Sequence, residues 1–193
     1  MITVLLDSSN TNLSVGIARD NLLLESTSYE AWQRQSEYMI PELNKLFDKY
    51  HVSKEDIGEV IVAMGPGSYT GVRIAITIAK TIAVALNAKL YAVSSLRVQK
   101  DGDNPSICLI NARSSRSYFG VYSGNQIIVP DCILKNEEVL TYIAEHPSFS
   151  VCGDVKYLGL SGKETNNIAE MLSLKDSLED VNPLSLKPVY MKD

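Results

Sequence analysis

The residues with the clearest potential for chemistry form a glycine-rich turn, Gly65 to Gly71, that leads directly into a long apolar segment. Its glycines permit positive φ and close backbone approach, and Ser68 or Thr70 can cap the helix that follows. The free backbone N–H groups and the dipole at such a helix start favour an anion. The same residues also suit a capped turn that binds nothing, so both interpretations stay open.

This turn lacks the spacing of two common phosphate-binding loops. A Walker A loop places Lys and then Ser or Thr after its last glycine, whereas Val72 and Arg73 follow Gly71 here. The dinucleotide-binding fingerprint has two residues between its second and third glycines, and this turn has three between Gly67 and Gly71. The residues that could still make an anion or nucleotide contact are Gly65, Gly67, Ser68, Thr70, Gly71 and Arg73.

Other residue types that support catalysis or metal binding are sparse. The two histidines, His51 and His146, are far apart in the sequence, and neither lies beside a convincing nucleophile. Cys108, Cys132 and Cys152 form no CxxC pair, which argues against a zinc site or a disulfide framework and favours a reducing compartment. We therefore predict no catalytic residue and no metal site.

The elements that must position the turn follow the same order in both halves of the chain. Expected strands cover 2–7, 13–18, 22–30, 59–64 and 89–95, and then 106–112, 117–122, 126–134 and 149–154. Expected helices cover 35–50, with Ser36 as N-cap, 69–87, 136–146 and a weaker segment at 166–174. A polar segment at 99–105 predicts two domains, 1–98 and 99–193. Hairpins followed by crossover units predict an α/β chain with mixed sheets and flanking helices.

The two helices expected in the first half have more apolar surface than one sheet needs. Small residues at 75, 79 and 83 form a smooth ridge, and isoleucines at 74, 78 and 82 form a second apolar row. A surface helix needs only one buried stripe, so the extra face suggests a partner chain, unless the preceding helix or the second domain covers it. The predicted interface residues are Met39, Leu43, Leu46, Phe47, Ala75, Ala79, Ile82 and Ala83.

Composition limits the class of protein further. The chain has 193 residues, 45% of them hydrophobic, with a formal net charge of -5, which argues against a stand-alone nucleic-acid binder. The amino terminus lacks the basic start and long apolar core of a signal peptide. The longest apolar run, 72–86, is interrupted by Thr77, Lys80 and Thr81 and is short for a membrane span. We expect a cytoplasmic protein without a membrane partner.

The string GPGSYTGVRIAITIAKTIAVALNAKLYAVSSL, residues 65–96, closely resembles the signature of the TsaB family, also called YeaZ. Weaker matches to the family are LLDSSNTNLSVGI at 5–17, QSEYMIPELNKL at 35–46, NARSSRSYFGVY at 111–122 and KPVYMKD at 187–193. Tyr69 replaces the usual Phe, Asn111 stands where an Asp is usual, and the second half is shorter than is common in the family. The resemblance is strong over the first hundred residues and thin beyond them.

This resemblance implies two ribonuclease-H-like domains of the actin/Hsp70-type ATPase superfamily. It implies a non-catalytic subunit of the machinery that places a threonylcarbamoyl group on the adenosine beside the anticodon of certain tRNAs. The implied partners are the transferase TsaD, bound through residues 36–50 and 69–87, the ATPase TsaE and, without TsaD, a second copy of the chain. No cofactor is implied for the chain alone, and ATP or ADP is implied within the complex.

The resemblance also assigns expectations to single residues. Asp7 occupies the first-strand position where active members of the superfamily orient phosphates and metal, and here it either remains from that role or accepts hydrogen bonds from the Ser8–Ser9 turn. The tRNA is expected to meet mainly the partners, with local contacts from Arg113, Arg116 and Lys187. Two alternatives stay open: an active ATP-dependent kinase or ATPase of the superfamily, and, with least support, a peptidase.

Overall fold

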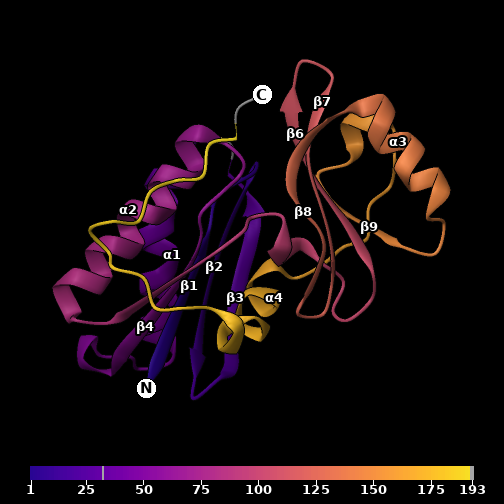
Figure 1. The fold of residues 1–193 in the computed structure, drawn as a ribbon. Helices are drawn as coiled ribbons and strands as arrows, with labels where there is room; N and C mark the ends of the chain where they lie inside the picture. The colour runs from indigo at the N-terminus through magenta and orange to yellow at the C-terminus, as the bar shows by residue number, and fades with distance from the viewer. Residues whose placement is uncertain (32, 192–193) are drawn as a thin grey trace.

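Two mixed β-sheets form the framework of the chain in the computed structural model, which describes residues 1–31 and 33–191 (Figure 1). The first sheet has the strand order β3-β2-β1-β4-β5. Its antiparallel part consists of β1 (Ile2–Asp7), β2 (Asn12–Arg19) and β3 (Leu22–Glu30). The strands β4 (Ile57–Ala63) and β5 (Lys89–Val93) continue it in parallel with β1. The expected α/β class with mixed sheets is confirmed.

The second sheet repeats the order of the first four strands, as β8-β7-β6-β9. It consists of β6 (Ser106–Arg113), β7 (Arg116–Ser123), β8 (Gln126–Lys135) and β9 (Ser150–Gly153). Only β9 runs parallel to its neighbour β6. One helix, α3 (Asn136–Glu145), packs on this sheet through Val139 and joins β8 to β9. The repeated order of elements read from the two halves is therefore a repeated topology.

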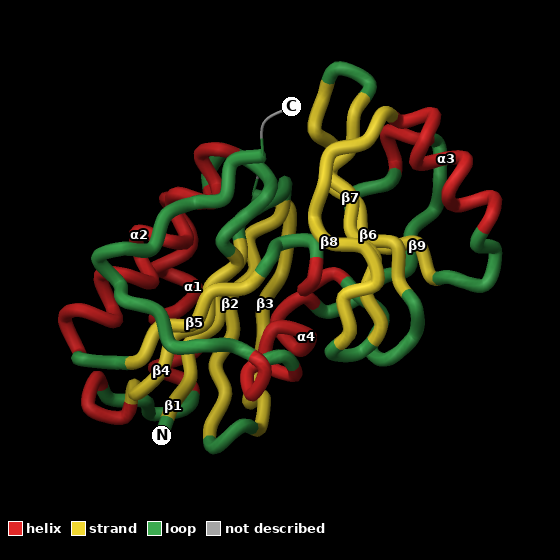
Figure 2. Tube along the Cα trace, in the orientation of Figure 1, coloured by secondary structure: helices red, strands yellow, loops and turns green. Residues whose placement is uncertain are grey.

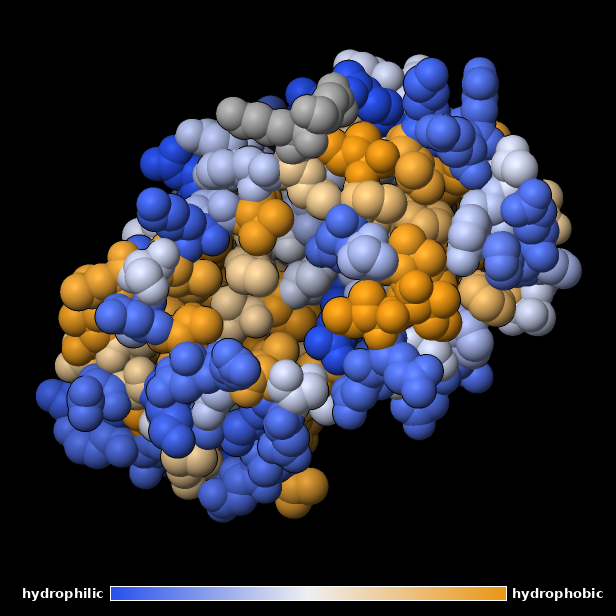
Figure 3. Space-filling view, in the orientation of Figure 1, coloured by the Kyte–Doolittle hydropathy of each residue, from blue (hydrophilic) through white to orange (hydrophobic). Residues whose placement is uncertain are grey.

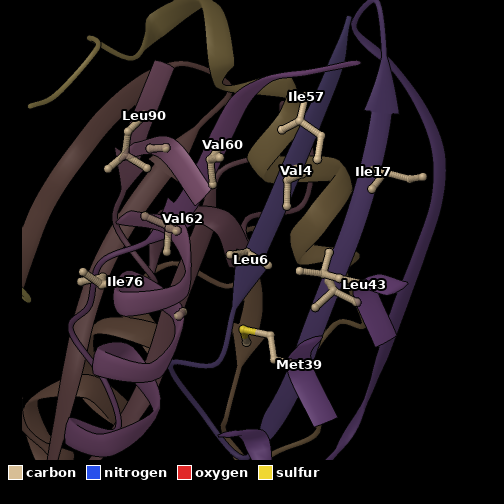
Figure 4. Packing of buried hydrophobic residues seen from close by; sticks show 14 of the residues in the cluster. Val4, Leu6, Ile17, Met39, Leu43, Ile57, Val60, Val62, Ile76 and Leu90 are labelled. Carbon is tan, nitrogen blue, oxygen red and sulfur yellow. The ribbon is translucent and has the colours of Figure 1, made fainter. Parts of the chain in front are cut away.

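Helices cover both faces of the first sheet because its central strands are apolar on both sides. In β1, Val4 and Leu6 point toward α1 (Gln35–Lys49) and α2 (Tyr69–Leu86), and the intervening Leu5 points toward α4 (Asn167–Ser173). Figure 4 shows Met39 and Leu43 of α1 and Ile76 of α2 in one cluster with the strand residues Val4, Leu6 and Val62. This two-sided burial is what the unbroken apolar run at the amino terminus predicts.

The division into lobes differs from the expected domains 1–98 and 99–193. The segment from α4 onward returns to the first sheet, where Ile168, Met171 and Leu174 pack against its second face. Two ion pairs between side chains of low exposure hold this segment in place. They join Lys175 to Glu59 at 2.5 Å and Lys100 to Glu170. Figure 2 shows the following loop running along α2, where the Lys80 ammonium donates to the Leu186 carbonyl. Lobe I is therefore residues 1–93 with 166–191, and lobe II is residues 106–160.

The helix ends show which capping predictions hold. Ser68 caps α2, because its hydroxyl accepts a hydrogen bond from the Gly71 N–H at 3.2 Å. The helix ends at Asn87, which adopts the left-handed conformation with φ 52°. Ser36, in contrast, does not cap α1, because that helix already begins at Gln35 and its N-cap position is Arg34, which makes no side-chain cap. The N-cap prediction for Ser36 is wrong.

Candidate functional site

The glycines of the turn allow the start of α2 to contact the turn between β1 and β2. A Cβ at Gly71 would stand 1.9 Å from the Ser8 carbonyl oxygen, and one at Gly67 would stand 2.2 Å from the Ser9 carbonyl oxygen. The Ser68 N–H donates to the Ser9 carbonyl at 2.6 Å, and the Ser8 hydroxyl donates to the Gly71 carbonyl at 2.8 Å. These two glycines thus serve backbone-to-backbone packing, which any larger residue would prevent.

Gly65 fixes the other end of the turn. Its φ is 103°, a conformation that favours glycine, and its N–H donates to the Ser95 hydroxyl at 2.9 Å. A Cβ at this position would stand 2.7 Å from the carbonyl oxygen of Val189. The carboxy-terminal segment therefore lies directly on the turn, and the Val189 N–H donates to the Met64 carbonyl at 2.8 Å.

Asp7 lies beneath the turn and is 2% exposed. One carboxylate oxygen accepts from the Ser9 N–H at 2.8 Å, and the other accepts from the Asn167 side-chain amide of α4 at 3.1 Å. The hydrogen bond expected from the Ser8–Ser9 turn is present, and the contact with α4 is an addition that the sequence did not predict. Both oxygens of Asp7 therefore hold parts of the chain together.

A cleft of about 600 Å³ separates the two lobes beside this turn. Its lobe I wall includes Ser9, Asn10 and Thr11 of the β1–β2 turn, Gln33, Gln35, Ser36, Gly67 to Thr70, and Ile74. Its lobe II wall consists of Ile110, Asn111, Ala112, Arg113, Tyr118 and Asp154. The Ser9 hydroxyl is buried and has no hydrogen-bond partner among the described residues. We call this space the inter-lobe cleft.

The charges on the cleft wall come from lobe II. Burial raises the pKa of Asp154 above its ordinary value, although the Asn111 backbone N–H donates to its carboxylate and Lys156 lies nearby. Arg113, at the end of β6, is exposed and contributes a cation to the same wall. The lining residues from lobe I carry no charge. Among the described lining residues, Arg113 and Asp154 are therefore the ones that would exert a strong electrostatic field on a ligand in the cleft.

The structure brings only part of the predicted anion site to the cleft. Gly67, Ser68 and Thr70 line it. Asp7, Gly65 and Gly71 lie in the packed interior, and Arg73 lies on the outer side of α2, where its guanidinium donates to the Tyr69 hydroxyl at 2.5 Å. The assignment of these last four residues to one ligand-binding surface is therefore wrong, because the turn packs against β1 and β2 with its glycines inward. An anion contact from Gly67, Ser68 and Thr70 stays a prediction.

A second hollow, of about 530 Å³, runs between α1 and α2 on the outside of lobe I. We call it the helix groove, lined by Ser36, Ile40, Tyr69, Thr70, Arg73, Ile74, Thr77 and Ile78. Tyr69 forms its end wall and stacks on Tyr190, with ring centroids 5.1 Å apart. Ser36, Tyr69, Thr70 and Ile74 line both the groove and the inter-lobe cleft, so the two hollows are continuous.

None of the eight predicted interface residues lines the helix groove, and six of them are buried. The side chains of these six lie in the core between the helices and the sheet, with exposed fractions between 0% and 3%: Met39, Leu43, Leu46, Ala75, Ala79 and Ala83. Phe47 and Ile82 are half-buried. The prediction that the alanine ridge faces outward is wrong, because small residues let α2 approach the sheet closely and so form its inner stripe. The isoleucine row is the one that borders the outer surface.

The sequence contained a signal for several residues that the prediction missed. The isoleucine row was visible by its spacing, and Ile74 and Ile78 line the helix groove together with Ile40. Asp154 directly follows β9 as Met64 directly follows β4, the equivalent strand of lobe I. The repeated order of elements could therefore have placed Asp154 at the cleft. Nothing in the local sequence indicates the contact between Asn167 and Asp7.

Helix α2 is unusually apolar for its position. By length and composition it is the one described helix that could cross a membrane, and a third of it is buried in the chain. Figure 3 shows apolar residues gathered at the left edge of the molecule, over the carboxy-terminal half of α2, where Val84 is 59% exposed. Among the described residues, no group of three or more His, Cys, Asp or Glu side chains could hold a metal ion.

Comparison with known proteins gives consistent results. The family model of TsaD, tRNA N6-adenosine threonylcarbamoyltransferase, matches residues 29–181. The chain is 30% identical over 216 aligned positions to the tRNA threonylcarbamoyladenosine biosynthesis protein TsaB of Bacillus subtilis, covering all of this chain and 94% of that protein. It is 27% identical to the uncharacterized protein MG208 of Mycoplasma genitalium, over 94% of this chain and 89% of that one.

The solved structure of YeaZ from Pseudomonas aeruginosa superimposes with a TM-score of 0.85 at 23% identity, over 98% of this chain and 99% of that chain. This similarity confirms the expected α/β fold with two mixed sheets and flanking helices. The full-length match to a curated relative then decides which family with this fold the sequence represents. The chain belongs to the TsaB (YeaZ) family.

Proposed function

We propose that this chain is a non-catalytic subunit of the tRNA threonylcarbamoyladenosine modification machinery, and that it acts by docking on a TsaD-type transferase. The observation that carries the proposal is the helix groove, an apolar hollow between α1 and α2 that no other part of the described chain covers. The Bacillus subtilis relative, which matches along the whole chain, is named for this biosynthesis. The direct role is binding, and the chemistry belongs to the partner.

The groove has the features of a protein interface. Ile40 is 43% exposed and faces the isoleucine row of α2, and Arg73 and Tyr69 close one end with a cation–π contact at 5.2 Å. Arginine and tyrosine around an aliphatic centre are typical of the residues that contribute most to binding. A helix with an apolar outer row is also stabilised when a partner removes that row from water. In the absence of the transferase, a second copy of the chain would use the same face.

The arrangement of polar residues supports a role without catalysis by this chain. His51 follows α1 in lobe I and His146 follows α3 in lobe II, where His146 stacks on Tyr142 and donates a hydrogen bond from Nδ1 to the Tyr142 carbonyl. Both carboxylate oxygens of Asp7 accept hydrogen bonds from within the chain. The alternative of an active ATPase of the same superfamily would require Asp7 to leave these partners. Steady ATP turnover by the isolated chain that disappears in Asp7→Asn would favour that alternative.

We place the nucleotide of the assembly, ATP or ADP, at the inter-lobe cleft, where it would bind only in the complex. The support is the continuity of the two hollows: a transferase in the helix groove would contact Tyr69 and Thr70, which also line the cleft. Ser9 and the N-terminus of α2 line the same space from lobe I. TsaE would then join where nucleotide and both chains meet, and tRNA would be held mainly by the partners.

Size-exclusion chromatography with the transferase of the same organism tests the proposal. The native chain is expected to co-elute with it, and the double variant Ile40→Glu, Ile78→Glu is expected to bind at least about 30-fold more weakly, as loss of an interface centre worth 2 kcal/mol implies. The control is Ile127→Glu, Ile128→Glu, which changes exposed isoleucines of β8 in lobe II. Equal binding by the groove variant and the native chain would overturn the proposal. Ala79 is unsuitable for this test because it is buried in the core.

A further inference from the structure

The chain crosses between the two lobes twice, at residues 94–105 and again at 161–165. The first crossing follows β5 and contains a short 3-10 helix, η2 (Arg97–Gln99). The two crossings are in contact, because the Thr165 hydroxyl donates to the Gln99 carbonyl at 3.1 Å. Lobes joined in this way can rotate about a hinge and so open or close the cleft between them. The contacts of the first crossing therefore decide whether these lobes rotate.

Apolar residues of the first crossing are embedded in both lobes. Leu96 belongs to a buried cluster of lobe II, together with Cys108 of β6 and Tyr122 of β7. Val98, two residues later, belongs to the buried cluster of lobe I that contains Met171 of α4. Both side chains are 0% exposed. Rotation of the lobes would pull Leu96 or Val98 out of a close-packed core and leave a cavity, which is strongly destabilising.

Polar contacts join the same crossing to the edge of the lobe II sheet. The Ser94 hydroxyl donates to the Asp131 carboxylate of β8 at 2.6 Å, and the other oxygen of this carboxylate accepts from the Tyr122 hydroxyl. The Arg97 guanidinium donates to the Asn125 carbonyl, in the turn between β7 and β8, at 3.0 Å. Hydrogen bonds to a charged group are stronger than those between neutral groups. Both contacts would break if lobe II rotated away from the crossing.

The crossing also connects the two walls of the inter-lobe cleft. The Ser95 N–H donates to the Gly65 carbonyl at 2.9 Å, and the Ser95 hydroxyl accepts from the Gly65 N–H at 2.9 Å. The Ser95 carbonyl accepts from the Gln99 side-chain amide at 2.8 Å. The Gln99 side chain lies against Gly153, where a Cβ would stand 2.1 Å from its Oε1. Gly65 begins the glycine turn and Gly153 precedes Asp154, so residues 95–99 fix one wall relative to the other.

We propose that residues 94–99 act as a clamp that holds the two lobes at one angle, so that the inter-lobe cleft receives its ligand without lobe closure. A ligand shifts a conformational equilibrium only by its difference in affinity for the two states. Here the second state would have to expose Leu96 and break the contact between Ser94 and Asp131. A cleft that is fixed in advance loses no lobe motion on binding, which favours affinity.

The identity of the ligand, ATP or ADP, rests on the proposed function. With the lobes clamped, the docked transferase would complete the nucleotide site by adding its own residues beside Tyr69 and Thr70, which line both hollows. It would not act by closing the lobes of this chain. The clamp residues are thus positioning residues, and the measurement that tests them is the distance between the lobes.

Double electron–electron resonance between one nitroxide on each lobe tests the clamp in the full chain. The labels are placed at Asn44 of α1 and Thr141 of α3, which are both exposed, through a ketone amino acid that leaves the three cysteines native. We expect one narrow distance distribution for the chain alone. Its maximum should move by less than about 2 Å in the complex with the transferase, with or without ATP and Mg²⁺. A distribution with two peaks, or a larger movement in either complex, would overturn the proposal.

Leu96→Ala removes the residue that locks the crossing into lobe II, and Leu109→Ala is its matched control. Leu109 is also 0% exposed, but it lies in the lobe II cluster on the α3 side of the sheet. Both variants lose stability through a cavity, so both are measured well below their unfolding transitions. Only Leu96→Ala is expected to widen the distance distribution by more than about 2 Å. Equal widths for the two variants would overturn the proposal.

A second clamp variant is available in case Leu96→Ala does not fold. The double variant Ser94→Ala, Arg97→Gln removes the hydrogen bonds to Asp131 and Asn125 and leaves both apolar cores intact. It should also widen the distribution relative to the native chain. A native width in this variant would overturn the proposal, because the polar contacts would then not restrain the lobes.

The outcome is separable from the test of the proposed function. None of the substituted clamp residues lines the helix groove, so co-elution with the transferase is measured independently of the distance between the lobes. A transferase that binds the native chain and moves its lobes would overturn the clamp and leave the proposed function. A narrow distance distribution in a chain that does not co-elute with the transferase would remove the proposed function and leave the clamp.

Discussion

Gly71 and Ser8 are in backbone contact, so that a Cβ at Gly71 would stand 1.9 Å from the Ser8 carbonyl oxygen. This contact joins the start of α2 to the end of β1 and sets the lobe I wall of the cleft. The neighbouring atom is backbone and cannot move aside. Gly71→Ala is therefore expected to lower the free energy of unfolding by about 3 kcal/mol, the upper range for overpacking, in urea denaturation.

Gly58→Ala is the matched control for this change. Its Cβ would meet only the flexible end of the Met1 side chain, which can shift. The control should lose less than about 1 kcal/mol. Similar losses at the two positions would contradict the packing account of the glycine turn.

The pair Lys175–Glu59 holds the carboxy-terminal segment on the first sheet. Its atoms are 2.5 Å apart, the two side chains are 11% and 6% exposed, and Glu59 also accepts from the Thr3 hydroxyl at 2.7 Å. Lys175→Met leaves the Glu59 carboxylate buried beside an apolar group, so we expect a loss of about 3 kcal/mol by thermal or chemical unfolding. Lys54→Met, in an exposed pair with Glu55, should change stability by less than about 0.5 kcal/mol. A loss at Lys175 as small as at Lys54 would show that the pair is dispensable.

Asp154 should make the folded chain less stable at neutral pH. Burial raises its pKa, so the folded chain holds this proton more tightly than the unfolded chain, and stability falls as pH rises from about 3.8 through the raised value. Asp154→Asn is expected to unfold at a higher denaturant concentration than the native chain at pH 7, and at the same concentration below pH 3.8.

Asp101 provides a control of opposite sign. The Ser150 hydroxyl and the Asn104 amide lower its pKa by donating hydrogen bonds to its carboxylate, so Asp101→Asn should reduce stability at pH 7. A decrease in stability for both variants at pH 7 would contradict the assignment of a desolvated carboxylate to the cleft.

A substitution in the turn between β6 and β7 should increase the stability of the folded chain. Ser114 and Ser115 form a two-residue turn with φ of 49° and 58°, a conformation that favours Asn and Gly. Ser115→Gly should raise the unfolding free energy by about 0.5–1 kcal/mol in urea titrations. Ser173→Gly in the short helix α4 should have the opposite sign. A loss of stability in Ser115→Gly would mean that the turn is held by contacts of the serine itself.

Much of the fold follows from local patterns. The apolar run 2–7, the alternation at 13–18 and the isoleucine spacing of 69–87 predict β1, β2 and α2 because strand and helix periods differ. The return of 166–191 to lobe I could not be predicted in this way. It depends on contacts such as Asn167 with Asp7 and Lys175 with Glu59, which join residues far apart in the sequence.

The candidate site was only partly predictable for a related reason. Glycine serves phosphate binding and close backbone packing equally well, so Gly67 and Gly71 could not be assigned before Ser8 and Ser9 were located. Likewise, helical spacing separates the alanine row of α2 from its isoleucine row without indicating which one faces the sheet. That choice depends on the shape of the surface beneath, which no residue of the helix encodes by itself.

Photo-cross-linking in the cell tests the docking claim most directly. A photoreactive amino acid at Thr77, which is exposed in the helix groove, is compared with one at Ile127, exposed on β8. We expect a cross-link from position 77 to the TsaD-type transferase and none from position 127. A transferase cross-link from position 127 alone, with position 77 unreacted, would contradict it.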